Sequence, residues 1–101
     1  MPAIPVDFHE EAIAEARAAR EWYESRSPAA AIGFFEELEH AVEQIAKFPE
    51  AWSPYLEGAR RYLLRRFPYS VVYRKRERDI QVVAVAHHSR KPGYWKGRIK
   101  T

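Results

Sequence analysis

The sequence predicts an α+β fold in which a pair of helices packs on one face of a mainly antiparallel sheet. Apolar residues recur at helical spacing through residues 10–48, and from residue 62 onward they alternate in the period of strands. The length of 101 residues, 47% of them hydrophobic, is enough for one modest hydrophobic core. We therefore expect a single domain over residues 1–101.

A short strand should come first, followed at once by a helix. The strand is expected at residues 4–8, where apolar residues alternate, and Pro5 fits only an edge strand or the start of a strand. The helix is expected from Glu10 to about Ser25, with acidic residues in its first turns, where the helix dipole favours negative charge. Its apolar stripe consists of Ala12, Ile13, Ala16, Ala19, Trp22 and Tyr23.

A second helix should run from Pro28 to about Phe48. Ser27 is a favoured N-cap, Pro28 is tolerated at the first helical position, and the helix should end before Pro49. The turn between the two helices is so short that they must form an antiparallel hairpin. The apolar stripe consists of Ala31, Phe34, Phe35, Leu38, Ala41, Val42, Ile45 and Phe48, of which Phe35, Leu38, Val42 and Ile45 are predicted core residues.

Three strands should complete the sheet after a loop at residues 49–59. They are expected at Tyr62–Phe67, Ser70–Lys75 and Ile80–His88, and the short connection at residues 76–79 forces an antiparallel hairpin between the last two. Because the last strand is apolar on both faces, we expect it at a central position in the sheet. One face should carry Ile80, Val82, Ala84 and Ala86, and the other Val83 and Val85.

Charge is divided unevenly along the chain. The 17 basic and 14 acidic residues give a net charge of +3, but residues 1–59 carry 4 bases and 12 acids, a net −8. Residues 60–101 carry 13 bases and 2 acids, a net +11. This asymmetry favours a surface suited to an anionic partner, although two solvated faces that neutralise each other within one fold explain it equally well.

The composition also excludes several kinds of site and location. The chain has no cysteine, which rules out thiol catalysis, disulfides and zinc sites of the Cys types, and suits a reducing cytosol. No apolar run approaches the ~20 residues of a membrane span, and the first residues do not resemble a secretory signal. We expect a cytoplasmic protein that contacts no membrane.

The sequence contains no motif that indicates a nucleotide-binding site, a metal site or a serine hydrolase site. The four glycines form neither a P-loop nor a dinucleotide fingerprint, so no cofactor is expected. His87 and His88 are neighbours on a strand, point to opposite faces and cannot chelate one metal ion together. Ser89 lacks the strained elbow of a serine hydrolase, and the acids of the second helix fit a solvated helix face better than paired catalytic carboxylates.

The remaining candidate site is a set of arginine, histidine and aromatic residues in the basic part of the chain. Guanidinium groups bind phosphates and aromatic rings stack on unpaired bases, so RNA or another phosphate-rich partner is one interpretation. The binding candidates are Arg61, Arg65, Tyr73, His87, Lys91, Trp95 and Arg98. Metal-independent RNA cleavage is also supported, with the catalytic candidates Arg66, His88, Arg90 and Tyr94. For any single residue, solvation or packing is the simpler explanation.

Several stretches, in order along almost the whole chain, carry a resemblance to a known family. They are residues 22–23, 34–38, 48–49, 65–73 and 84–98, and the last two contain the patterns FPY-x-x-x-Y and H-x-x-R-x-P-x-Y-W-x-x-R. Together they resemble the RelE/ParE toxins of type II toxin–antitoxin systems, also called the plasmid stabilisation protein family. The resemblance implies a growth-inhibiting toxin with this order of strands and helices, neutralised by a cognate antitoxin that wraps it, often in a higher-order assembly.

The resemblance leaves the molecular target open. RelE-like members cut messenger RNA in the ribosome, whereas ParE-like members inhibit DNA gyrase by binding and need no catalytic residues. This chain lacks the lysines that the RelE pattern places around Arg61–Arg65, and Ser70 stands where that pattern has an arginine. We therefore favour ParE-like inhibition of DNA gyrase, with a ribosome-dependent, metal-independent endoribonuclease as the alternative. A degenerate toxin that only binds its antitoxin is a third alternative.

Overall fold

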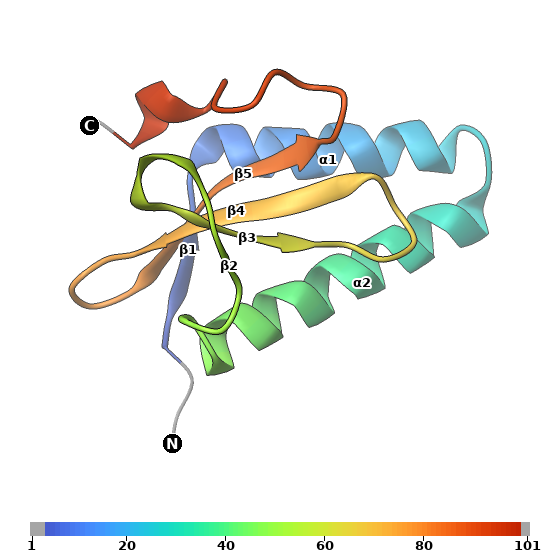
Figure 1. Cartoon of the computed structure of the whole chain (residues 1–101). Coiled ribbons are helices and arrows are strands. Elements are labelled where there is room, and N and C mark those ends of the chain that lie inside the picture. The colour runs from blue at the N-terminus through green and yellow to red at the C-terminus, as the bar shows by residue number, and fades with distance from the viewer. Residues whose placement is uncertain (1–3, 100–101) are drawn as a thin grey trace.

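The computed structural model describes residues 4–99 and has two layers, a pair of helices and a five-stranded sheet (Figure 1). The predicted α+β class is confirmed. The chain begins with β1 (Val6–Phe8), α1 (Glu10–Glu24) and α2 (Pro28–Lys47), and the two helices form the expected hairpin behind the sheet. No helix among the described residues is long and apolar enough to cross a membrane.

Both helices begin at capped residues, which is why their starts can be read from the sequence. The Ser27 side chain accepts a hydrogen bond from the backbone N–H of Ala30 at 3.3 Å, and Pro28 occupies the first helical position. At the start of α1, His9 Nδ1 accepts from the backbone N–H of Glu11 at 3.0 Å. Each cap satisfies a backbone donor that the helix itself leaves unpaired.

The sheet has the strand order β1-β5-β4-β3-β2, in which β1 runs parallel to β5 and the other pairs are antiparallel. Its later strands are β2 (Ser53–Pro54), β3 (Arg60–Leu63), β4 (Tyr69–Lys75) and β5 (Ile80–His87). The predicted last two strands are confirmed to within one residue. Pro5 directly precedes β1, which lies at an edge, so the structure agrees with both positions that Pro5 allowed. β5 lies inside the sheet between β1 and β4.

The predicted strand at Tyr62–Phe67 is wrong in its bounds, because β3 covers Arg60–Leu63 and the chain turns away after it. Glu37 of α2 provides the physical reason. Its carboxylate accepts hydrogen bonds from the backbone N–H groups of Arg65 and Arg66, the second at 3.3 Å. Those two donors are therefore not available to a strand ladder.

The predicted faces of β5 are also wrong in part, because a β-bulge interrupts its pairing with β4. Two consecutive residues of β4 pair with Ala84 and Val82, so Val83 is an extra residue on β5. The alternation of side chains shifts at that point. The face toward the helices carries Ile80, Val82 and Val85, and the opposite face carries Val83, Ala84 and Ala86.

Each face of the sheet has its own apolar cluster. The cluster on the helix side contains Leu38 and Ile45, which are buried as predicted. Phe35 was also expected in the core but is 47% exposed, because its neighbour Phe34 fills the space against the rings of Phe67 and Tyr69. Val42, the fourth predicted core residue, is only half-buried.

Candidate functional site

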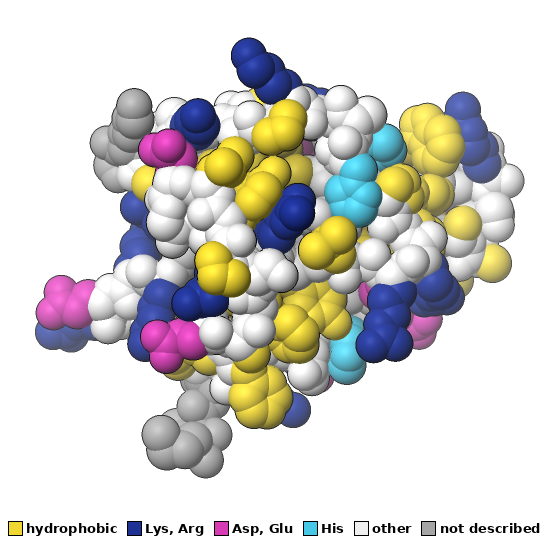
Figure 2. Space-filling view, in the orientation of Figure 1, with side chains coloured by type: hydrophobic (Ala, Val, Ile, Leu, Met, Phe, Trp, Pro, Cys, Tyr) yellow, Lys and Arg dark blue, Asp and Glu magenta, His cyan; other side chains and the backbone are white. Residues whose placement is uncertain are grey.

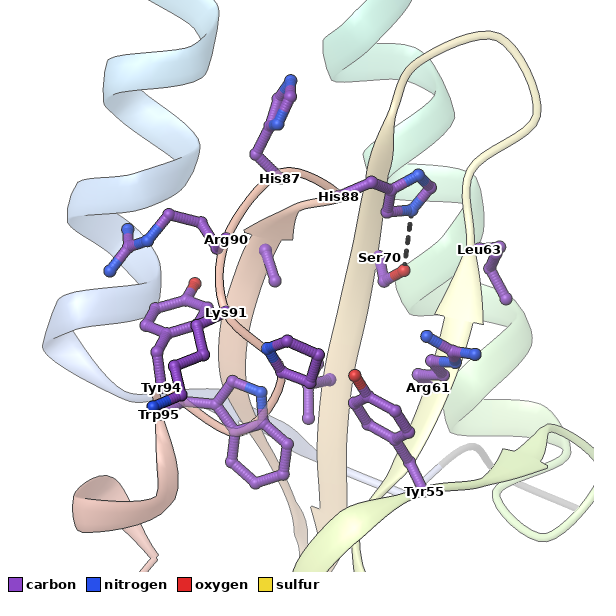
Figure 3. A pocket seen from close by; sticks show the side chains of 13 residues that line it. Tyr55, Arg61, Leu63, Ser70, His87, His88, Arg90, Lys91, Tyr94 and Trp95 are labelled. Atoms are coloured by element: carbon purple, nitrogen blue, oxygen red, sulfur yellow. Dashed lines mark hydrogen bonds between the residues drawn. The ribbon is translucent and has the colours of Figure 1, made fainter.

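The face of the sheet opposite the helices is covered by the segment that follows β5 and by the turn that precedes β3 (Figure 1). Trp95 of the first segment is 1% exposed and clusters with Val72 and Ala84. A cavity of about 220 Å³, here called the C-terminal cavity, lies beside it. Its described lining residues are Tyr55, Arg61, Leu63, Ser70, Val72, Ala86, His87, His88, Arg90, Lys91, Pro92, Tyr94 and Trp95 (Figure 3).

Arg61 of β3 supplies the cation on one wall of this cavity. Its guanidinium carbon lies 4.2 Å from the centre of the Tyr55 ring, which is a cation–π contact. Its Nε atom is buried and has no hydrogen-bond partner among residues 4–99. The described lining residues include other basic side chains and no carboxylate. The cavity therefore suits an anionic or acceptor group from a partner.

His88 forms a pair with Ser70 of β4. Ser70 Oγ lies 2.9 Å from His88 Nε2, and Ser70 as a whole is 3% exposed. His87 points away from this pair in Figure 3, and its Nδ1 lies 2.7 Å from Ser89 Oγ. The two histidines thus point in different directions, as expected. Within the described part of the chain, no group of three or more potential ligands is placed to hold a metal ion.

Arg90 and Tyr94 lie on the α1 side of β5, away from Arg61 (Figure 3). The Arg90 guanidinium carbon is 3.8 Å from the centre of the Tyr94 ring. The Tyr94 hydroxyl donates to Glu15 Oε2 at 2.7 Å, and Arg98 donates two further hydrogen bonds of 2.9 Å to the same carboxylate. Burial, and then this bond to Glu15, raise the pKa of Tyr94, so its hydroxyl is a protonated donor with a fixed acceptor.

The other predicted arginines lie outside the C-terminal cavity. Arg66 Nε donates to a Glu37 carboxylate oxygen at 3.4 Å, in a region where Arg65 and Arg66 face residues of α2. The structure therefore brings three of the four catalytic candidates, His88, Arg90 and Tyr94, to one cavity and separates Arg66 from them.

Three of the predicted binding residues are held within the fold. Tyr73 is fully buried on the helix side, and its hydroxyl donates to the carbonyl oxygen of Pro49 at 2.8 Å. Burial raises the pKa of Tyr73 to about 12, although the positive charge of Arg60 opposes the shift. Trp95 is 1% exposed, and the Arg98 side chain is 16% exposed. Trp95 lines the C-terminal cavity from this buried position, together with the predicted binding residues Arg61, His87 and Lys91.

Two residues that shape this region were absent from the predicted site. Tyr55 lies in the loop before β3 and contacts Arg61. The sequence offers one local signal for this contact, which is an aromatic residue shortly before a strand that begins with arginines. Glu15 is one of the acidic residues near the start of α1, where the helix dipole alone explains a negative charge. Its contact with Tyr94 spans 79 residues of sequence, and no local pattern announces it.

Basic side chains on this face are dispersed around apolar ones and do not form one continuous patch (Figure 2). Ion pairs between the acidic and the basic parts of the chain explain much of the uneven charge, since Arg98 pairs with Glu15 at 2.9 Å and Arg66 with Glu37 at 3.4 Å. These ion pairs agree with the explanation in which the two parts neutralise each other within the fold. The suitability of the basic part for an anionic partner stays a prediction.

Fold and site together define a class: a small α+β protein with a helical hairpin on one face of its sheet and a cationic cavity on the other. The family described as the ParE toxin of type II toxin-antitoxin system, parDE, matches residues 6–92. A chain of the solved structure "Chromosomal ParDE TA system from P. aeruginosa" has a TM-score of 0.68 and 21% identity, over 84% of this chain and 96% of that chain. The curated proteins gave no match.

The family match covers most of the sequence, and this chain therefore belongs to the ParE toxin family of type II toxin–antitoxin systems. The resemblance stated from the sequence is confirmed. The solved structure shows that the fold is shared, at a level of identity that carries no conclusion about activity. Membership of the family implies an antitoxin as a partner.

Proposed function

We propose that this toxin arrests growth by binding DNA gyrase and not by cutting RNA. The observation that carries the proposal is the separation of Arg66 from the other three side chains that RNA cleavage would use. Arg66 is bound to Glu37 on the α2 side, whereas Tyr94 is bound to Glu15 on the α1 side. General acid–base catalysis needs its groups within hydrogen-bond reach of one phosphodiester, so this separation favours inhibition by binding.

The rim of the C-terminal cavity is the surface that we propose for the contact with gyrase. Arg61, Arg90 and Lys91 line it, and Tyr55 supports Arg61 through its ring. Arginine and tyrosine are the residue types that most often carry the binding energy of protein interfaces. The positive charge of the rim, which has no carboxylate among its described lining residues, suits carboxylate or carbonyl groups of a protein target.

Ribosome-dependent RNA cleavage is the second candidate function, because one observation favours it. Arg61, His88 and Arg90 all line the C-terminal cavity, and imidazole and guanidinium groups are suited to proton transfer and to the stabilisation of a charged phosphorane. In this alternative His88, which is paired with Ser70, moves the proton. Arg66 has no part in it, because it lies outside the cavity.

For the antitoxin, we propose the outer groove of the helical hairpin, on the face of the molecule opposite the C-terminal cavity. This groove between α1 and α2 has a volume of about 440 Å³. Ile13 and Phe35 line it and are 44% and 47% exposed, and Ile32 nearby is 62% exposed. Exposed apolar side chains gathered in this way are typical of an interface, and an amphipathic helix fits a groove between two helices.

A supercoiling assay with purified gyrase tests the gyrase proposal. Antitoxin-free toxin is titrated into a reaction with relaxed plasmid and ATP, and we expect supercoiling to stop. Arg61→Glu should weaken the inhibition, whereas the matched variant Arg78→Glu should not, because Arg78 is exposed on the β4–β5 turn and does not line the cavity. Supercoiling that continues at toxin excess would contradict the proposal.

A further inference from the structure

The carboxylate of Glu15 collects hydrogen bonds from segments that lie far apart in the sequence. Its Oε1 accepts from the backbone N–H of Val85 at 3.0 Å and from Arg98 Nη1 at 2.9 Å. Its Oε2 accepts from the Tyr94 hydroxyl at 2.7 Å and from Arg98 Nη2 at 2.9 Å. One side chain of α1 thus binds both β5 and the segment that covers the C-terminal cavity.

This cluster is enclosed, and it complements the β-bulge of β5. The Glu15 and Arg98 side chains are 15% and 16% exposed. Glu15 accepts from the N–H of Val85, and Arg98 donates to the carbonyl oxygen of Val83 at 3.0 Å. A bulge disturbs the regular ladder of a strand, and here side chains satisfy the carbonyl of the extra residue, Val83, and the N–H of Val85 two residues further on. The position of Glu15 is therefore well determined.

A second contact leads from this cluster to the surface. The Arg90 guanidinium carbon lies 3.8 Å from the centre of the Tyr94 ring, while the Tyr94 hydroxyl is held by Glu15. Arg90 is exposed and lines both the C-terminal cavity and the neighbouring groove along α1. The Tyr94 side chain therefore contacts Arg90 through its ring and Glu15 through its hydroxyl, and so connects the two charged side chains.

We propose that Glu15 is a positioning residue for target binding, which acts through Tyr94 to hold the Arg90 guanidinium in place at the rim of the C-terminal cavity. This inference rests on the proposed function, in that the rim is taken as the contact with gyrase. An unrestrained arginine populates many rotamers, and restricting it before binding reduces the entropy lost in the complex. Glu15 raises affinity in this way without touching the target.

Glu15→Gln tests the proposal, with Glu21→Gln as the matched control. The substitution at Glu15 keeps the shape of the side chain but removes its charge and turns an NH₂ group toward the donors of Tyr94 and Arg98. Glu21 is an exposed residue of the same helix. The first readout is the side-chain Nε–H signal of Arg90 in NMR spectra, which the Tyr94 ring shifts. The second is the toxin concentration that halves gyrase supercoiling.

We expect Glu15→Gln to move the Arg90 Nε–H signal toward the position of an unrestrained arginine and to raise the half-inhibitory concentration about fivefold, the order expected when one rotamer-rich side chain is no longer restricted before binding. Glu21→Gln should change neither. Arg90→Ala should weaken inhibition by a similar factor, and the double variant should be little weaker than Arg90→Ala alone. If the double variant weakens inhibition by the product of the two single-variant factors, Glu15 and Arg90 act independently and the proposal is overturned.

Tyr94→Phe keeps the proposal testable if Glu15→Gln fails to fold, because this variant removes only the hydroxyl and keeps the ring. It should shift the Arg90 signal in the same direction as Glu15→Gln. An unchanged Arg90 signal in the folded Tyr94→Phe protein overturns the proposal. If the unmodified toxin leaves gyrase active, the gyrase function fails, while the NMR signal of Arg90 still decides whether Glu15 positions it.

Discussion

Glu37 binds Arg66 in two ways, since its carboxylate accepts the backbone N–H at 3.3 Å and the side-chain Nε at 3.4 Å. The Glu37 side chain is 12% exposed, whereas that of Arg66 is 64% exposed. The two partners therefore contribute unequally to the fold. The carboxylate satisfies backbone donors where the chain leaves β3, and the guanidinium remains largely in solvent.

Glu37→Ala should destabilise the protein more than Arg66→Ala does. Without the carboxylate, the backbone N–H groups of Arg65 and Arg66 lose their acceptor, at an expected cost of about 1–3 kcal/mol in the free energy of unfolding. Arg66→Ala removes an ion pair of a largely exposed guanidinium, worth about 0–1 kcal/mol, and one hydrogen bond of 3.3 Å to the carbonyl oxygen of Gly33. Urea unfolding measures both, and equal losses would show that the guanidinium and not the turn carries the stability.

Leu38→Ala and Phe35→Ala form a matched pair on α2. Leu38 is 6% exposed, and its truncation should cost roughly 2–5 kcal/mol in the free energy of unfolding. Phe35 is 47% exposed, so its truncation should cost less than Leu38→Ala in stability and should weaken antitoxin binding instead. Denaturant unfolding and calorimetry with the cognate antitoxin separate the two effects. A Leu38→Ala loss below about 1 kcal/mol would mean that α2 packs through another face.

Tyr73 should make stability depend on pH in the alkaline range. Its pKa is raised by burial to about 12 from an ordinary value of 10.0, so the folded state holds the proton more tightly than the unfolded state. Its contribution to stability is complete below about pH 10 and is lost as the pH rises toward about 12. Tyr73→Phe cannot ionise and should lose less stability over that range.

The measurement is the free energy of unfolding of both proteins at about pH 8 and about pH 11. At the lower pH the variant lacks only the hydrogen bond to Pro49, worth about 1 kcal/mol. Other buried tyrosines titrate in both proteins, and the difference between the two profiles isolates Tyr73. Parallel profiles would contradict the assignment.

Local signals were sufficient for the helices and for the last two strands. Ser27 and Pro28 mark the start of α2, and the turn at residues 76–79 joins β4 to β5 as expected. Caps and short turns act over a few residues, so the sequence displays their causes directly. The edge position of β1 agrees with one of the two positions that Pro5 allowed.

Long-range contacts account for the differences. Strand alternation cannot show that Glu37, on a helix, ends β3, nor that Val83 is an extra residue that reverses the faces of β5 beyond it. Phe34 and Phe35 both fall on the apolar stripe of α2, and only packing selects Phe34 for the core. In each case the deciding contact is made with a residue that is distant in the sequence, and the periodicity of a short segment does not show it.

The sequence indicates only those members of the candidate site that residue type reveals, and not those that depend on long-range contacts. Arg61, His88 and Arg90 were named from residue type and line one cavity. Tyr73 was named on the same ground but lies on the helix face of β4, and Glu15 gave no signal because its partners are 70 to 83 residues away.

Protein synthesis in a purified ribosome system distinguishes inhibition by binding from RNA cleavage. Antitoxin-free toxin is added, and the integrity of the messenger RNA is followed in the same tubes, with gyrase supercoiling measured on the same preparation. We expect continued synthesis, intact messenger RNA and inhibited gyrase. If the toxin cuts the messenger RNA and the His88→Ala variant leaves it intact, inhibition by binding alone is contradicted. The C-terminal cavity is then established as a nuclease site.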